Sequence, residues 1–398
     1  MELLDYVGSR STGIRTAQAE RAGLGAFLAR LDWIMLAAVV GLVGYGLWAI
    51  AGITRHDVEG DPRYFVVRQA AFVAAGAIAL VGVLFVDPQV FRRRRRAIYA
   101  ATLGLMVIVF FAAPYTRGSK RWLDFGFFRF QPSEFGKLLL ILFLAGFLAD
   151  RGRRISETRT TLAAVGFAAG PILLVFVQPD IGTALVYGIA LGAVLFVAGT
   201  RWSHLAVLGA VTAVAALALL WFLPSKGVDV LKPYQVKRLT AFTHPDQDPR
   251  GTTYNVNQSV TAVGAGGLRG RGIEGATQTN LNYLPEHATD FAFASLAEQR
   301  GFFGASTLLL LYLLVVWRGL KMVTMARDAF SAAAAGGIVL ALLFQIFVNV
   351  GMTIGIAPIT GIPLPFVSVG GSSMVSNLLA IGVLESIHTR ARVGRRGS

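Results

Sequence analysis

The stretch LPEHATDFAF, from Leu284 to Phe293, is the part of this sequence whose residue types and spacing suggest chemistry most directly. It brings two carboxylates, a histidine and a threonine to the threshold of an apolar run that continues to Trp317. Asp290 stands directly before Phe291. A carboxylate at such a boundary can accept a proton as a general base, or it can simply begin the helix by capping backbone amides. Asp290 is therefore the first candidate for a catalytic residue.

A second pair of ionisable residues lies within an apolar run. Glu134 and Lys137, in QPSEFGKLLLILFLAGFL, are three residues apart and share one helical face. Such a pair can neutralise itself. An unpaired charge in hydrocarbon costs at least about 2.5 to 3.5 kcal/mol, so ionisable groups there are otherwise functional by default. Both interpretations of this pair stay open from the sequence.

Three further segments could contact a substrate. GSKRWLDFGFFRF offers Lys120 and Arg121, which suit a phosphate, and Trp122, which suits either the membrane interface or stacking on a sugar ring. Asp180, in QPDIGTAL, opens a helix and could be its N-cap or a ligand contact. GIPLPFVSVGGSS, residues 361–373, has irregular backbone at the membrane, which we expect to line a cavity.

Several other chemistries are not supported. GRGIEG, residues 270–275, matches G-x-G-x-x-G but lacks the flanking strand and helix of a dinucleotide site, so we expect a flexible or close-packed glycine hinge. The chain has no Walker A sequence, and its histidines show no metal-ligand spacing. The absence of cysteine removes thiolate chemistry and cysteine zinc sites. We therefore predict no metal site.

The elements that must position these residues are membrane helices. The 398 residues are 55% hydrophobic and only 15% charged, which is typical of a polytopic membrane protein. We predict an all-α integral membrane fold with about ten spanning helices. The apolar runs are residues 32–53, 64–86, 97–113, 134–149, 160–177, 181–199, 204–223, 291–317, 331–355 and 370–388.

The distribution of lysine and arginine predicts the orientation. Basic residues concentrate in the segments that face the cytoplasm if both termini lie inside. The chain then divides into a cytoplasmic tail, residues 1–31, that contains a short interfacial helix, a polytopic domain, residues 32–388, and a basic cytoplasmic tail, residues 389–398. The long loop between the seventh and eighth helices, residues 224–290, is extracytoplasmic, so chemistry in water could occur there. The net charge of +15 is spread over these loops, which favours anionic lipid over nucleic acid as a partner.

Five linked motifs resemble the SEDS (shape, elongation, division and sporulation) family of bacterial proteins, typified by RodA and FtsW, from about Leu31 to Ile387. They are GSKRWLDFGFFRFQPSEFGKL, QPDIGTAL, DPRGTTYNVNQSVTAVGAGGLRGRG, LPEHATDFAFASLAEQRGFFG and NVGMTIGIAPITGIPLPFVSVGGSS. LDW and DPRYFVVRQ look more like RodA than FtsW. Two departures are Ala288, where the family often has histidine, and Val369, where it usually has an aromatic residue.

The resemblance implies a ten-helix glycosyltransferase of the bacterial cytoplasmic (inner) membrane, which polymerises lipid II into peptidoglycan strands. Its implied partners are a class B penicillin-binding protein, which is a transpeptidase, and other membrane proteins of the elongation complex. The aspartate that the family requires matches Asp290. Asp290 would accept the proton of the acceptor 4-hydroxyl as that oxygen attacks C1 of the donor MurNAc, and undecaprenyl pyrophosphate would leave.

The departing pyrophosphate needs cationic stabilisation. Arg121 and Lys137 are the first candidates, followed by Lys120 and Arg238; no cofactor is identified, and a divalent cation is left open. The remaining predicted substrate contacts are Trp122, Glu134, Asp180, Gln258, Ser259, Glu286, Thr289, Ser368 and Ser372. A lipid II flippase, a scaffold for the transpeptidase and a division-type paralogue are the alternative functions.

Overall fold

The computed structural model describes residues 25, 27–114, 120–126, 128–227, 230–240 and 252–395. Its long helices are α2 (Trp33–Ile53), α3 (Tyr64–Leu84), α5 (Arg95–Ala112), α6 (Pro132–Ala149), α7 (Thr158–Val177), α8 (Ile181–Ala198), α9 (Trp202–Leu217), α14 (Ala292–Met325), α15 (Ala329–Thr353) and α16 (Gly371–Arg395). Each corresponds to one predicted apolar run, which confirms the all-α membrane fold. In the described part of the chain, nine helical spans are long and apolar enough to cross a membrane; α9 counts together with its continuation to Ser225, and α16 is not among the nine.

Shorter elements join these helices. They are α4 (Pro88–Arg93), β1 (Leu123–Asp124), β2 (Arg129–Phe130), η1 (Gly152–Ser156), η2 (Ala218–Phe222), α10 (Leu223–Ser225), α11 (Pro233–Thr240), α12 (Thr252–Gly266) and α13 (Thr277–Asn280). β1 and β2 form a two-stranded antiparallel hairpin just before α6.

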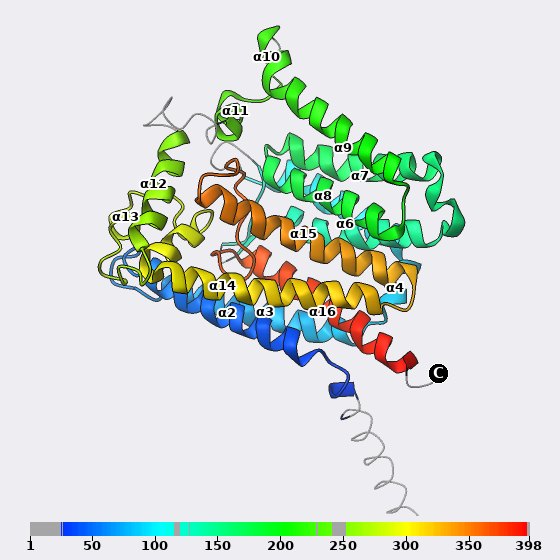
Figure 1. Cartoon of the computed structure of the whole chain (residues 1–398), viewed down its shortest axis with the longest axis horizontal. Helices are drawn as coiled ribbons and strands as arrows, with labels where there is room; N and C mark the ends of the chain where they lie inside the picture. Colours follow the sequence, from blue (N-terminus) through cyan, green and yellow to red (C-terminus); the bar gives the residue numbers. More distant parts are fainter. Residues whose placement is uncertain are drawn as a thin grey trace, which may run out of the picture.

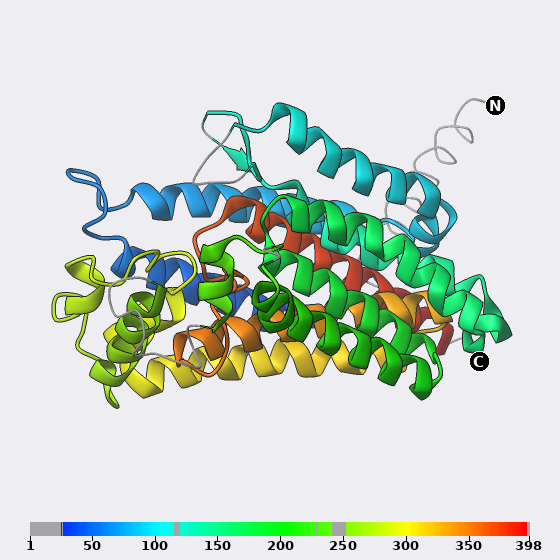
Figure 2. The same cartoon turned by 90° about the horizontal axis from the view of Figure 1, so that it is seen from above.

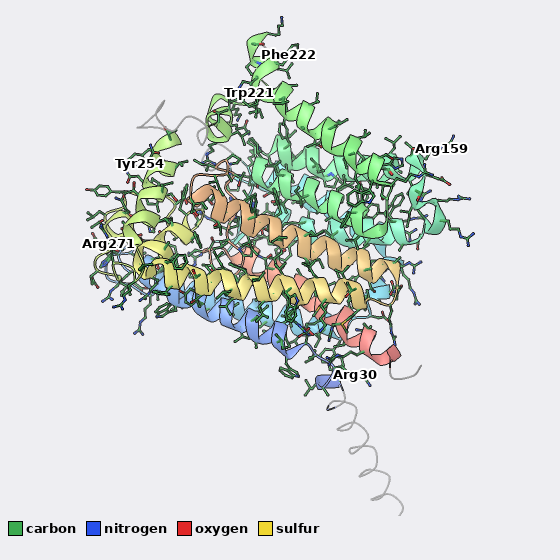
Figure 3. All side chains as sticks on the ribbon, viewed as in Figure 1. Arg30, Arg159, Trp221, Phe222, Tyr254 and Arg271 are labelled. Carbon is green, nitrogen blue, oxygen red and sulfur yellow. The ribbon has the colours of Figure 1, made fainter. Side chains whose placement is uncertain are left out.

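The long helices run along one direction and form a bundle with two distinct ends (Figures 1 and 2). α12 and α13 lie at one end, which we call the loop end, and α4 lies at the other, which we call the arginine-rich end. Figure 3 shows Tyr254 and Arg271 at the loop end and Arg159 at the opposite end. α9 diverges from the bundle, and none of its residues is buried.

The core of the bundle centres on α6 and α15, which are its most buried spans. Small residues in α15 allow close helix packing, because a Cβ on Gly337 would lie 2.6 Å from Val194 Cγ2 and 2.7 Å from Ile141 Cγ2. Small residues commonly serve this purpose in membrane helices, where van der Waals packing drives association. The core thereby holds α6 and α8, which carry several candidate site residues, against α15.

Two helices extend beyond their predicted ends. α14 continues past Trp317 to Met325, and α16 continues past His388 to Arg395. Arg318 is buried in α14, where its Nε donates to Asp32 Oδ2 at 2.8 Å. Hydropathy alone predicts that the span ends before Arg318, because it takes no account of a pairing partner. The partner that allows Arg318 to be buried is Asp32, which is far away in sequence.

The predicted loop 224–290 contains helices of its own. α12 packs against α14 and α15. Val256 and Ala262 of α12 form a small apolar cluster with Leu284, Phe291 and Ile359. This cluster fixes the segment on both sides of Asp290 against the end of the bundle.

The GRGIEG segment is close-packed, which is one of the two forms that the sequence predicts for it. α14 is kinked at Gly301, where φ is 65°. The backbone N–H groups of Arg271 and Gly272 donate to the carbonyls of Glu298 and Gln299 at 2.9 and 3.0 Å. A Cβ on Gly270 would lie only 2.3 Å from Gln299 O. The loop therefore satisfies carbonyl groups that the kink would otherwise leave unpaired.

Parts of the predicted termini lie outside the described residues. Residues 1–24 of the predicted cytoplasmic tail are among them, as are residues 396–398 of the basic tail. The described part of the interfacial segment packs on the bundle, because Phe27 stacks on Phe85 with ring centroids 5.2 Å apart, and Leu31 is buried. Its position relative to a membrane stays a prediction.

Candidate active site

Asp290 lies in the turn that leads into α14, at the loop end of the bundle. The N-cap of α14 is Phe291, and no side chain caps the helix. The Asp290 carboxylate has no hydrogen-bond partner among the described residues, whereas its backbone carbonyl accepts from Asn349 Nδ2 at 2.9 Å. The geometry therefore gives no support to the alternative in which the side chain of Asp290 serves only to begin the helix.

The irregular segment 361–373 lies directly against the Asp290 turn. Ser368 Oγ donates to Thr289 O at 2.5 Å, and Val369 N donates to Ala288 O at 2.9 Å. Asn349 Nδ2 also donates to Ile362 O at 2.8 Å. Val369 therefore contributes its backbone N–H here, a bond that does not depend on the aromatic side chain usual in the resembled family.

Charged residues from three other segments act on the Asp290 carboxylate. Burial and the charges of Glu286 and Asp180 raise the pKa of Asp290, Arg238 and Arg121 lower it, and the net result is a pKa of about 6. Arg238 belongs to α11, and Arg121 precedes β1. A Cβ on Gly361 would lie 3.5 Å from Asp290 Oδ2 and 3.9 Å from Arg238 Nη1, so both charged groups border this glycine. The arrangement places a carboxylate with a raised pKa beside two guanidinium groups.

Asp180 is the N-cap of α8, which confirms one of its two interpretations. Its Oδ1 accepts from Thr183 N at 3.1 Å. Its Oδ2 accepts from Gln131 Nε2 at 3.1 Å and lies 3.7 Å from Arg121 Nη1. Ser372 Oγ accepts from Gln131 N at 2.9 Å. Asp180 and Ser372 thus help to hold the segment between β1 and α6, and Asp180 orients Arg121 toward the site.

Glu134 and Lys137 form the self-neutralised pair that is one of their two interpretations. Both are buried, with Lys137 Nζ 2.9 Å from Glu134 Oε2, and Lys137 also donates to Gln345 Oε1 at 2.7 Å. Lys137 is not among the charges that shift the pKa of Asp290. In the structure, Lys137 is therefore bonded to Glu134 and Gln345. The sequence analysis instead ranks Lys137 with Arg121 as a first candidate for stabilising the pyrophosphate.

The other candidates occupy varied positions. Ser259 is buried and donates to Thr353 O at 2.8 Å, while Thr289 Oγ1 donates to Glu286 Oε2 at 2.9 Å. Lys120 is exposed, and Trp122 and Gln258 are half-buried. Their roles toward a substrate stay predictions.

The sequence reasoning missed three supporting residues, which are Asp57, Gln69 and Asn349. Asp57 Oδ1 lies 3.0 Å from His287 Nε2, and this pair ties the Asp290 turn to the segment between α2 and α3. Burial lowers the pKa of His287, but the hydrogen bond and charge of Asp57 outweigh this effect and leave the pKa above its usual value. Gln69 and Asn349 bond to backbone on the 361–373 segment. The sequence does contain a signal for Gln69 and Asn349, because each is a polar amide within an apolar run. It contains no such signal for Asp57.

No group of three or more histidine, aspartate or glutamate side chains suited to a metal ion is found within the described ranges. A divalent cation that accompanies the substrate stays a prediction from the resemblance.

Comparisons with known proteins agree over nearly the whole chain. The family model FTSW_RODA_SPOVE, described as cell cycle protein, matches residues 29–393. The peptidoglycan glycosyltransferase MrdB of Escherichia coli K12 is 36% identical over 91% of this chain and 95% of its own length. The probable peptidoglycan glycosyltransferase FtsW of Thioalkalivibrio sulfidiphilus is also 36% identical, over 92% of this chain and 93% of its own.

Solved structures agree with the fold. One, titled "Structural coordination of polymerization and crosslinking by a peptidoglycan synthase complex", gives a TM-score of 0.77 at 28% identity and covers 91% of this chain and 98% of that one. The rod shape determining protein RodA of Thermus thermophilus gives a TM-score of 0.67 at 25% identity, over 90% of this chain and 96% of that one.

Proposed function

The chain belongs to the FtsW, RodA and SpoVE family of cell cycle proteins and is a peptidoglycan glycosyltransferase, and we propose that it polymerises lipid II with Asp290 as the general base. The single observation that carries the assignment of the base is the carboxylate of Asp290, which has no hydrogen-bond partner among the described residues and has a pKa near 6. General bases are most effective when their pKa lies near the working pH.

The proposed reaction follows from this placement. Asp290 accepts the proton of the acceptor 4-hydroxyl, and the hydroxyl oxygen forms a bond to C1 of the donor MurNAc. The bond from C1 to the pyrophosphate breaks, and undecaprenyl pyrophosphate leaves with its charge. Because Asp290 stands at the entrance of α14, the sugars can react in water while the lipid chains stay beside the helices.

Arg238 and Arg121 are the proposed stabilisers of the leaving pyrophosphate. Both act electrostatically on Asp290, so both lie near the reacting groups. Guanidinium groups suit phosphate oxygens because they present several donors in a fixed plane. Lys137 is less suited, since it is buried and bonded to Glu134 and Gln345.

A lipid II flippase is the main alternative. A transporter is expected to gather its substrate-binding polar groups near the membrane midplane. Here Glu134 and Lys137 neutralise each other, whereas the carboxylate of Asp290, which has no hydrogen-bond partner within the described ranges, lies at the end of the bundle. These positions favour an enzyme.

The test is glycan synthesis from labelled lipid II by the purified protein. We expect strands resolved on gels, and we expect their yield to rise with a class B penicillin-binding protein. That partner is part of the proposal, and a similar fold in a solved peptidoglycan synthase complex supports it. Translocation of lipid II without any strand formation, with or without the partner, would count for the flippase.

The elongation role is proposed over the division role. MrdB and RodA are among the similar proteins, and LDW and DPRYFVVRQ favour the RodA type. Overall identity does not separate the two roles, because an FtsW is as similar as MrdB. Restoration of rod shape, rather than of septation, in the corresponding depletion strains would support elongation.

We propose that both termini face the cytoplasm and that the loop end faces outward. The chain has no cysteine, so single reporters are clean. Leu268 at the loop end is 66% exposed, and Arg153 at the arginine-rich end is exposed as well. In spheroplasts, a membrane-impermeant maleimide is expected to label Leu268→Cys at once and Arg153→Cys only after permeabilisation. The opposite order of labelling would reverse the orientation.

A further inference from the structure

A cavity of about 660 Å³ opens at the arginine-rich end of the bundle, away from Asp290. It lies between α5, α6 and α7, and its volume is within the range of about 300 to 1,000 Å³ that is common for ligand sites. Four arginines line it, namely Arg95, Arg96, Arg151 and Arg154. Arg159, which Figure 3 labels at the same end, belongs to the first turn of α7.

The positive charge of this cavity exceeds its negative charge. Asp150 is the carboxylate that lines it, and this group already pairs with two arginines, Arg95 and Arg92, the latter at 2.8 Å. Arg96, Arg151 and Arg154 have no carboxylate partner in the part of the chain that the structure describes. Asp150 therefore does not neutralise these three guanidinium groups.

An aromatic wall continues from the arginines into the bundle. The guanidinium of Arg151 lies 4.7 Å from the ring centroid of Phe147. Phe167 packs edge-on against both Phe147 and Phe143, with centroids 5.2 Å apart in each pair. Phe143 is one helical turn deeper than Phe147, and it stacks on Tyr99 at 4.4 Å. The lining of the cavity thus combines a cationic rim with an aromatic wall.

We propose that this cavity binds an anionic phospholipid, with the phosphate on Arg96, Arg151 and Arg154 and an acyl chain along the aromatic wall. A basic pocket between membrane helices is a recognised site for anionic head groups. Phe143 and Phe147 are buried, whereas Phe167 keeps 37% of its surface exposed, so Phe167 is the ring that an acyl chain can cover and that a nucleotide or an acidic peptide would leave uncovered. The ligand that matches both halves of the cavity is an amphiphile with an acidic head.

Native mass spectrometry of the purified full-length protein can test this proposal, with phosphatidylglycerol and phosphatidylcholine as the probes. We expect phosphatidylglycerol to bind more tightly, and the double variant Arg96→Gln with Arg154→Gln to weaken it about tenfold or more, since each nearby basic residue contributes to anionic-lipid binding. The matched control is Arg93→Gln with Arg94→Gln. It removes the same charge from neighbouring exposed positions that do not line the cavity.

A further arm separates a lipid from free phosphate. Phe167→Ala is expected to weaken the binding of phosphatidylglycerol several-fold. Millimolar inorganic phosphate is expected not to displace the bound lipid. Equal loss of binding in the Arg93/Arg94 control would attribute binding to diffuse charge and overturn the site. Displacement by inorganic phosphate, or equal binding of phosphatidylcholine, would also overturn it. Unchanged melting temperatures would establish that the variants are folded.

Discussion

Asp290→Asn is expected to lower the rate of glycan-strand synthesis by about 10²- to 10⁴-fold, the usual contribution of a general base. That loss corresponds to roughly 3 to 5 kcal/mol of barrier at about 1.36 kcal/mol per decade. Asparagine keeps the shape of the side chain but removes its basic oxygen. Within the described ranges the Asp290 carboxylate accepts no hydrogen bond, and the bond from Asn349 goes to the backbone carbonyl, so the substitution should leave the fold intact.

The measurement is gel-resolved polymerisation by the purified variant, with a melting temperature equal to that of the parent. Glu274→Gln is a suitable control, because Glu274 is an exposed carboxylate of the same loop, 3.5 Å from Arg55. We expect it to retain the parent rate. A folded Asp290→Asn protein that works at more than about a tenth of the parent rate would exclude the proposed base.

Much of the scaffold was predictable from local sequence. Apolar runs determine where helices form, because a backbone in lipid must satisfy its hydrogen bonds within each helix. The ends of α14 and α16 were not predictable in the same way. Arg318 stays buried only because Asp32 pairs with it. That pairing depends on how distant helices pack.

The same limit applies to the site. The motifs made Asp290 the first candidate for the base, but the ranking of its cationic neighbours differs from the arrangement in the structure. Arg238 ranked behind Lys137 in the sequence, whereas in the structure Arg238 borders Gly361 beside Asp290, and Lys137 is bonded to Gln345. Their separation from Asp290 depends on how α11 and α6 pack. Sequence distance carries no information on that packing.

Arg238→Gln is expected to lower the polymerisation rate by about 10²- to 10³-fold, the usual cost of losing one group that stabilises developing charge. The substitution should also change the dependence on pH. A general base works in its ionised form, so the activity of the parent should be lost as pH falls through about 6, the pKa of Asp290. Arg238 lowers that pKa, and its removal should therefore move the acidic limb of the profile to higher pH.

The pH profile separates the two effects of Arg238. If it stabilises the leaving pyrophosphate, the rate of Arg238→Gln stays low even at a pH where Asp290 is fully ionised, and Arg238→Lys restores part of it by returning a positive charge. If activity instead recovers fully at high pH, Arg238 acts only through Asp290, and the leaving-group role is wrong. Arg129→Gln is the control, because Arg129 is exposed and paired with Asp124 at 3.2 Å. It should alter neither the rate nor the profile, since Arg129 is not among the charges that shift the pKa of Asp290.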